Sequence, residues 1–119
     1  MRIVFRGVFL TSENPEMTAK FYEQVAGLPL EKIGVDGQYT YWRIDMNGVQ
    51  LAIHDASTFA EYTHPARADS NLTHLYFKID DQGVFLGNLE RLNISPFSSD
   101  DVVITVMDPD GRKVMFGTA

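Results

Sequence analysis

The chain contains no cysteine, and this absence removes several kinds of chemistry at once. Disulfide frameworks, thiolate metal sites and cysteine nucleophiles are excluded. No apolar run is long enough for a membrane span, and the opening stretch MRIVFRGVFL, interrupted by Arg6, lacks the small-residue cleavage site of a signal peptide. We therefore expect this stretch to form a first strand, and the chain to be cytoplasmic with no membrane partner.

Basic residues are also scarce. The chain has 10 Lys and Arg against 16 Asp and Glu, a net charge of −6 with no basic cluster. Nucleic-acid surfaces need clustered Lys and Arg to replace the counterions of phosphates, so we expect no nucleic-acid partner. A length of 119 residues with 45% hydrophobic residues fits one compact domain with a real core.

The first quarter of the chain predicts a strand followed by a helix. In residues 3–11, apolar side chains occupy both sets of alternating positions, which predicts a strand covered on both faces. Asn14 suits an N-cap, Pro15 suits the first helical position, and Gly27 suits the end of the helix. One stripe of this helix recurs every four residues and is expected to be buried: Met17, Phe21 and Val25.

A β-hairpin is predicted at Asn47-Gly48, because both loop residues tolerate positive φ. A two-residue loop places three apolar pairs on one sheet face, namely Met46 with Val49, Ile44 with Leu51 and Trp42 with Ile53. A slip of one residue would mix the apolar and polar sets, so the pattern itself selects this register. The other face then carries Tyr39, Tyr41, Arg43, Gln50, Ala52 and His54.

The second half repeats this plan. A strand is predicted from Leu75 to Ile79, and Asp81 suits the cap of a helix that runs to about Leu92. Two further strands follow, DVVITVM and RKVMF, joined by a type I turn at DPDG with glycine in the left-handed position. The segment DPDGRKVMF at residue 108 echoes DMNGVQLAI at residue 45, which indicates a duplicated unit.

The duplication predicts the fold class. We expect an α+β domain in which two βαβββ modules form a curved, mostly antiparallel half-barrel sheet with helices outside. Module one covers about 1–56, a connecting loop about 57–71 and module two about 72–119. The loop is expected to hold a short helix near 58–62, and either covers the cavity mouth or only connects the modules. The concave lining is the expected place for a small ligand.

Four segments carry a family resemblance: FYEQVAGLPL, LAIHDA, THLYFKIDD and MDPDGRKVMF. In this order and spacing they resemble the glyoxalase, bleomycin-resistance and extradiol dioxygenase superfamily, the vicinal oxygen chelate proteins, over nearly the whole chain. The resemblance implies paired βαβββ modules. It also implies four cavity-facing strand positions, two in each module, that supply His, Gln or Glu to a divalent metal in metal-dependent members.

The implied metal positions match Gly7, Ala52, His74 and Met115, and only His74 is of a ligand type. Catalytic zinc is usually held by three protein ligands, so one imidazole is too few. The resemblance therefore predicts no metal and no cofactor. It points to a small-molecule-binding protein like the bleomycin-resistance proteins and leaves catalysis open, with no catalytic residue assigned.

The predicted ligand-binding residues lie on the presumed inner face, where aromatic faces bind planar or cationic groups and apolar side chains favour apolar ligands. Several have ordinary alternatives. Arg43 suits an ion pair with Asp45 or another nearby carboxylate, His74 suits a bond to a neighbouring carbonyl, and the tyrosines suit a subunit interface. The predicted set is Phe9, Tyr39, Tyr41, Arg43, Ala52, His54, His74, Tyr76 and Met115.

Three alternatives stay open. The first is a metal-dependent lyase, isomerase or dioxygenase of the glyoxalase type with a non-standard site around His74 and His54. The second is a zinc site built from these two residues and His64. The third is a dimeric scaffold without a ligand. We expect a homodimer, with the cavity within one chain or shared by modules exchanged between two chains.

Overall fold

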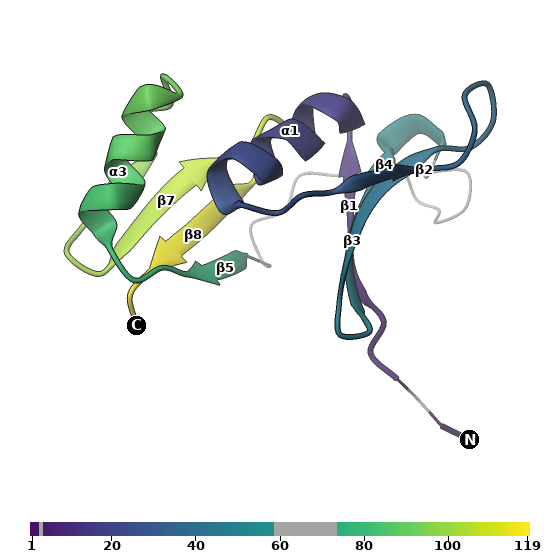
Figure 1. The fold of residues 1–119 in the computed structure, drawn as a ribbon, viewed down its shortest axis with the longest axis horizontal. Coiled ribbons are helices and arrows are strands. Elements are labelled where there is room, and N and C mark those ends of the chain that lie inside the picture. The colour runs from purple at the N-terminus through teal and green to yellow at the C-terminus, as the bar shows by residue number, and fades with distance from the viewer. Residues whose placement is uncertain (3, 59–73) are drawn as a thin grey trace. The chain divides into compact units, whose positions relative to one another are not determined.

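The computed structural model describes residues 1–2, 4–58 and 74–119. They belong to two compact units, Met1–Ala68 and Asp69–Ala119, which we call unit one and unit two. Each unit holds an open four-stranded sheet and one long helix, with strand orders β1-β4-β3-β2 and β5-β8-β7-β6 (Figure 1). In each sheet one pair is parallel and two are antiparallel. The predicted α+β fold of two βαβββ modules with mostly antiparallel sheets is confirmed.

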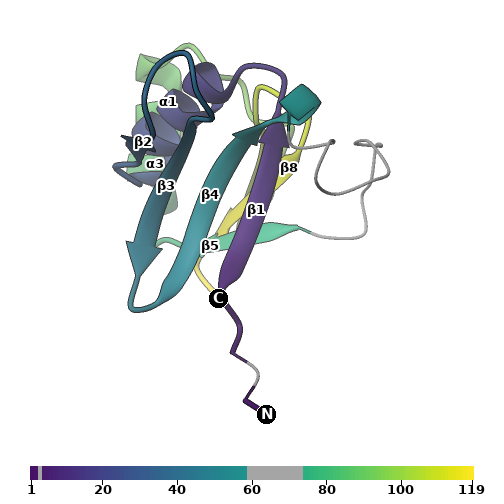
Figure 2. The same ribbon diagram turned by 90° about the vertical axis from the view of Figure 1, so that its right-hand side faces the viewer.

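The strands of unit one are β1 (Gly7–Ser12), β2 (Glu31–Ile33), β3 (Tyr41–Met46) and β4 (Val49–Asp55). Figure 2 shows β4 between β1 and β3. The hairpin has the predicted register, with Met46 opposite Val49 and Trp42 opposite Ile53. Its loop residues have φ angles of 57° and 88°, as a primed turn requires, so the hairpin prediction is confirmed.

The first strand begins at Gly7 and not at residue 3. Its parallel partner β4 starts at Val49, directly after the hairpin loop, so the residues before Gly7 have almost no strand beside them. Val4 and Phe5 are accordingly 66% and 68% exposed. The prediction that both faces of this strand are covered is also wrong, since Leu10 is buried but Phe9 is 48% exposed.

Helix α1 (Pro15–Ala26) has the predicted ends, with Asn14 accepting from the Met17 amide and Gly27 in the left-handed conformation. Phe21 and Val25 of the predicted stripe are buried, but Met17 is 51% exposed. The neighbouring Thr18 is fully buried and shares a 3.0 Å hydrogen bond with the Ser12 hydroxyl. Successive helical residues point about 100° apart, so the inward Thr18 turns Met17 to the surface.

The strands of unit two are β5 (Leu75–Lys78), β6 (Ser98–Ser99), β7 (Val103–Met107) and β8 (Lys113–Gly117). Helix α3 (Gln82–Arg91) is capped by the Asp81 carboxylate, which accepts from the Val84 amide at 3.0 Å. Phe85 and Leu89 are buried as predicted, whereas Leu92 caps the C-terminus and is half-buried. Phe85 packs on Phe116 with ring centroids 4.5 Å apart, which places α3 on its sheet.

The predicted turn at residues 108–111 is confirmed in its geometry. The Gly111 amide donates to the Asp108 carbonyl at 3.0 Å, and Gly111 has a φ of 87°. The buried Asp108 carboxylate also accepts from two backbone amides and from the Arg112 guanidinium. The turn is therefore held by one buried carboxylate whose two oxygens both accept hydrogen bonds.

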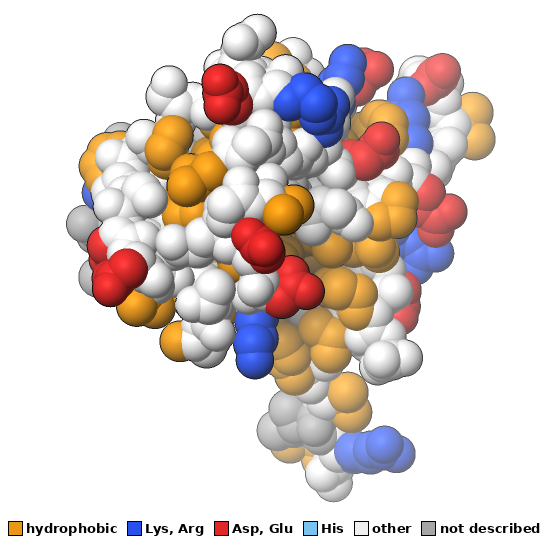
Figure 3. All heavy atoms as spheres, turned by 60° about the vertical axis from the view of Figure 1, so that its left-hand side comes forward, with side chains coloured by type: hydrophobic (Ala, Val, Ile, Leu, Met, Phe, Trp, Pro, Cys, Tyr) orange, Lys and Arg blue, Asp and Glu red, His pale blue; other side chains and the backbone are white. Residues whose placement is uncertain are grey.

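Some predictions fall on residues 59–73, which the structure does not describe. These are most of the short helix near 58–62, the possible lid over the cavity, and His64. The helices that the structure does describe are too short and too polar to cross a membrane. On the visible surface of Figure 3, acidic side chains are spread among apolar ones and form no single patch.

Candidate functional site

Five of the predicted site residues lie on one face of the unit-one sheet. Helix α1 packs against β1, β3 and β4, and alternation along the strands turns every second side chain away from the face that bears Leu51 and Ile53. The loop before β3 adds a further side chain to this opposite side. We call this set the aromatic face: Phe9, Tyr39, Tyr41, Arg43, Ala52 and His54.

His54 lies at the centre of the aromatic face. It is paired with Tyr41 across β3 and β4, and the two rings stack with centroids 4.8 Å apart and planes 12° apart. Phe9 reaches the imidazole diagonally from β1 at 5.1 Å. The Tyr39 hydroxyl lies 2.6 Å from the imidazole Nδ1. Three aromatic rings from three different segments thus contact one imidazole.

The charge state of His54 follows from its burial. Its side chain is only 7% exposed, and burial lowers the pKa of His54 because the charged imidazolium loses its hydration. A neutral imidazole can accept a hydrogen bond at Nδ1, and the Tyr39 hydroxyl is placed to donate it. The imidazole and the three rings around it, one stacked and two tilted, are therefore uncharged near neutral pH.

Arg43 lies on the same face, opposite Ala52 on β4 and Glu31 on β2. Its guanidinium Nη2 is 3.5 Å from the Glu31 carboxylate. The predicted ion pair of Arg43 with a nearby carboxylate is thus formed by Glu31 and not by Asp45, whose carboxylate accepts from the Gly48 amide at 2.9 Å in the hairpin loop. The Arg43 Nε is buried and has no hydrogen-bond partner among the residues that the structure describes.

The other three predicted residues lie in unit two. Tyr76 on β5 pairs with Met115 on β8, and Tyr76 is 45% exposed. A Cβ at Gly117 would overlap the Tyr76 hydroxyl and lie 3.1 Å from its Cε2, so this ring lies over the glycine. Its hydroxyl donates to the Ala119 carbonyl at 2.9 Å. His74 precedes β5 and is exposed.

The metal positions implied by the family do not fit a metal in this chain. Besides lacking a ligating side chain, Gly7 has no room for one, because a Cβ there would lie 2.7 Å from the Gln50 amide nitrogen and still closer to its carbonyl oxygen. In the described ranges, no three His, Asp or Glu residues are grouped as metal ligands. We therefore derive no chemical step through a metal.

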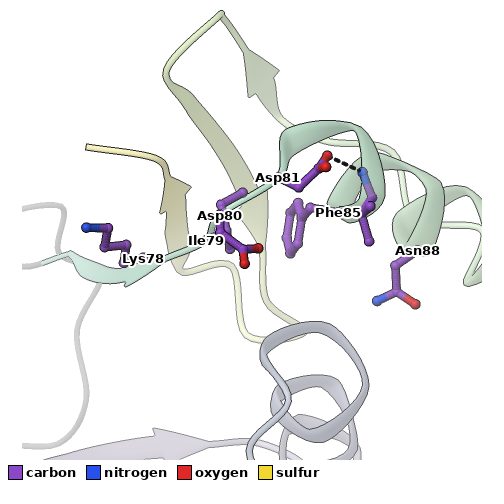
Figure 4. Close-up of a pocket in the computed structure, with 7 residues that line it drawn as sticks. Lys78, Ile79, Asp80, Asp81, Phe85 and Asn88 are labelled. Atoms are coloured by element: carbon purple, nitrogen blue, oxygen red, sulfur yellow. Dashed lines mark hydrogen bonds between the residues drawn. The ribbon is translucent and has the colours of Figure 1, made fainter.

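An open depression occurs in unit two, lined by none of the predicted site residues. It has a volume of about 720 Å³ and lies between the end of β5 and the first turns of α3 (Figure 4). The sequence analysis missed it, because Asp81 and Phe85 were assigned to capping and to the core, and they do perform those roles. In the sequence, only the adjacent Asp80 and Asp81 could have indicated this depression. Its lining consists of Lys78, Ile79, Asp80, Asp81, Val84, Phe85 and Asn88.

The paired βαβββ units define a class, because they are the fold of glyoxalase, bleomycin-resistance and dioxygenase proteins. Lactoylglutathione lyase from Agrobacterium tumefaciens has a TM-score of 0.65 and 19% identity over 96% of this chain and 92% of its own. A glyoxalase/bleomycin resistance protein/dioxygenase from Nocardioides has a TM-score of 0.67 and 17% identity over 98% and 83%.

A hypothetical protein from Staphylococcus aureus, SA1046, has a TM-score of 0.71 and 12% identity over 100% of this chain and 95% of its own. No family model and no curated protein matches the sequence. At these identities the likeness concerns the fold alone. The superfamily resemblance seen in the sequence is thus confirmed at the level of the fold.

Proposed function

We propose that this chain is a metal-independent small-molecule-binding protein that holds a planar aromatic ligand against the aromatic face of unit one. One observation carries the proposal: Phe9, Tyr39 and Tyr41 surround a buried His54 whose burial favours the neutral form. Phe9 and Tyr39 are 48% and 36% exposed, so parts of both rings face outwards. A flat apolar ligand gains both burial and ring stacking on such a surface.

The rings of this face are held before any ligand arrives. Strand pairing fixes the backbones of Phe9 and Tyr41, whose rings contact the buried His54, and Tyr39 is held by its hydroxyl bond to His54. A site whose side chains are already ordered loses less conformational entropy on binding, which raises affinity. Gly7 supports the metal-independent part of the proposal, because the backbone of Gln50 occupies the space that a ligating side chain needs.

Titration with 2-naphthamide, a neutral bicyclic probe, tests the proposal through two-dimensional amide NMR. We expect saturable shifts at β1, β3 and β4, and about three- to tenfold weaker binding in Tyr41→Ala, the range that one stacked ring supplies. Phe97→Ala is the matched control, because Phe97 is an exposed aromatic residue of unit two. Absence of saturable shifts, or equal losses in the two variants, contradicts the proposal.

The competing hypothesis of a glyoxalase-type metal enzyme is tested on the same preparation. Native mass spectrometry of protein purified without chelator reports bound metal and retained small molecules together. Stoichiometric divalent metal that disappears in His74→Ala would overturn metal independence and direct attention to lyase, isomerase or dioxygenase assays. Metal-free protein with a retained organic molecule supports the binding function.

A homodimer is part of the proposal. Each sheet ends in two edge strands, β1 and β2 in one and β5 and β6 in the other, and unpaired edges favour association. Exposed Val4 and Phe5 precede one of these edges. Light scattering after size exclusion tests this, and a monomeric mass at micromolar concentration would overturn it. The cytoplasmic location and the module boundaries stay predictions.

A further inference from the structure

We propose that the ligand carries an anionic group, a carboxylate or a group of the same shape and charge, and that Arg43 binds it beside the stacked rings. This inference rests on the proposed function and narrows its ligand from planar aromatic molecules to aromatic anions. Arg43 lies two residues after Tyr41 on β3 and on the same sheet face. Strand geometry separates their Cα atoms by roughly 7 Å, a distance that one arylcarboxylate spans.

The hydrogen bonding of Arg43 is incomplete among the described residues. A guanidinium has five N–H donors, and its Nε is buried without a hydrogen-bond partner there. A buried donor without an acceptor is costly, and such groups are rare unless a role retains them. The planar guanidinium matches a carboxylate with two parallel hydrogen bonds, which is the geometry that Arg binds best.

The Glu31 carboxylate does not meet this need. It lies 3.5 Å from Nη2, and its side chain is 67% exposed. Exposed ion pairs of this length contribute little, because water and salt screen them. A ligand carboxylate that binds Arg43 with water excluded is screened less than Glu31 and so interacts more strongly with the guanidinium. Glu31 then competes only weakly with the ligand for Arg43.

Apart from the carboxylates of Glu31 and Asp45, the neighbours of Arg43 carry no charge that would repel an anion. Ala52 opposite it offers no charge, and the pKa of His54 is lowered, so the imidazole is neutral. On the described part of the aromatic face, Arg43 is the one residue with a permanent positive charge. A planar cation would stack on the rings but would meet this guanidinium, whereas a planar anion gains from both.

Two probes with the same bicyclic ring test the inference on the unmodified protein. We expect 2-naphthoate to bind about tenfold more tightly than 2-naphthamide at low salt, since a charge-assisted bidentate contact is added. The difference should shrink as the salt concentration rises. Isothermal titration and amide NMR give both affinities and the location of binding.

Three variants sharpen the comparison. Arg43→Met keeps the length of the stem, so naphthoate affinity should fall about tenfold while naphthamide affinity changes less than twofold. Glu31→Gln removes the competing carboxylate and should strengthen naphthoate binding. Arg91→Gln is the charge-matched control, since Arg91 lies on α3 in unit two and hydrogen-bonds Asn88.

The outcomes separate the two proposals. Equal affinities for the two probes, unchanged in Arg43→Met, overturn the anion inference and leave the aromatic binding function standing. Tighter binding of naphthamide overturns the inference in the same way. Failure of both probes to bind removes the proposed function and the inference together. Should Arg43→Met unfold, the comparison of the two probes on the unmodified protein still decides.

Discussion

Phe9 on β1 and Tyr76 on β5 occupy equivalent positions in two sheets of the same topology. The pair Val8 and Leu51 corresponds to Leu75 and Val114, so Phe9 opposite Ala52 corresponds to Tyr76 opposite Met115. Two residues further along the last strand, His54 corresponds to Gly117. Phe9 therefore contacts an imidazole where Tyr76 lies over a glycine.

The difference shows that sheets of the same strand topology can carry two different surfaces. In unit one a small residue at position 52 is followed by a large imidazole at 54, and three rings gather around it. In unit two a large residue at 115 is followed by Gly117, and the Tyr76 hydroxyl bonds to the Ala119 carbonyl. The stacked surface thus belongs to unit one, while the aromatic residue of unit two mainly covers its own sheet.

The largest change in stability is expected from a substitution at the close approach of β1 and β4. Gly7→Ala places a Cβ in contact with the backbone of Gln50, which cannot move without opening the strand pair. We expect the free energy of unfolding to fall by about 2–3 kcal/mol, measured by urea denaturation. The control is His74→Ala at the equivalent position of unit two, where the side chain is exposed and the effect should stay within about 0.5 kcal/mol. Equal losses of stability in Gly7→Ala and His74→Ala would show that the two positions do not differ as described.

A smaller effect is expected at Gly117. Its added Cβ in Gly117→Ala meets the Tyr76 ring, a side chain that can rotate away at the expense of its hydrogen bond to Ala119. The expected loss in free energy of unfolding is about 1 kcal/mol. In the Tyr76→Ala background the same substitution should cost less, and a double-mutant cycle measures this coupling. Strict additivity would show that the ring does not lie over the glycine.

The smallest effect concerns pH. Because the pKa of folded His54 is below that of the unfolded chain, its neutral state contributes stability above the unfolded pKa of about 6.5. This contribution is lost as the pH falls through the folded pKa, with a slope of at most about 1.4 kcal/mol per pH unit. Relative to His54→Phe, the wild-type free energy of unfolding should therefore decline between pH 7.5 and 5. Parallel pH profiles would contradict the burial argument.

The sequence predicted the elements whose signals are local. The hairpin register followed from Asn47-Gly48 and a two-residue alternation, and the ends of α1 followed from Asn14, Pro15 and Gly27. Long-range contacts decided the rest. The burial of Thr18 in place of Met17 depends on Ser12, six residues away, and the late start of β1 depends on where β4 begins.

The candidate site, too, was predictable only in part. The hairpin register alone placed Tyr41, Arg43 and His54 on one face. The hydrogen bond from Tyr39 to His54 and the proximity of Glu31 to Arg43 depend on the path of the chain between β2 and β3, which has no periodic pattern. The sequence showed that Gly7 lacks a metal ligand, whereas only the backbone geometry shows that the position is closed.

That closure limits the routes by which this chain could acquire a metal site. A substitution of histidine for glycine at position 7 would have to separate β1 from β4, so the protein would lose stability in the same step that added one possible ligand. Protein engineers would meet the same obstacle and would have to rebuild the Gln50 segment before adding the imidazole. Mutation can therefore alter the ligand preferences that we propose for the aromatic face far more readily than it can convert this chain to metal chemistry.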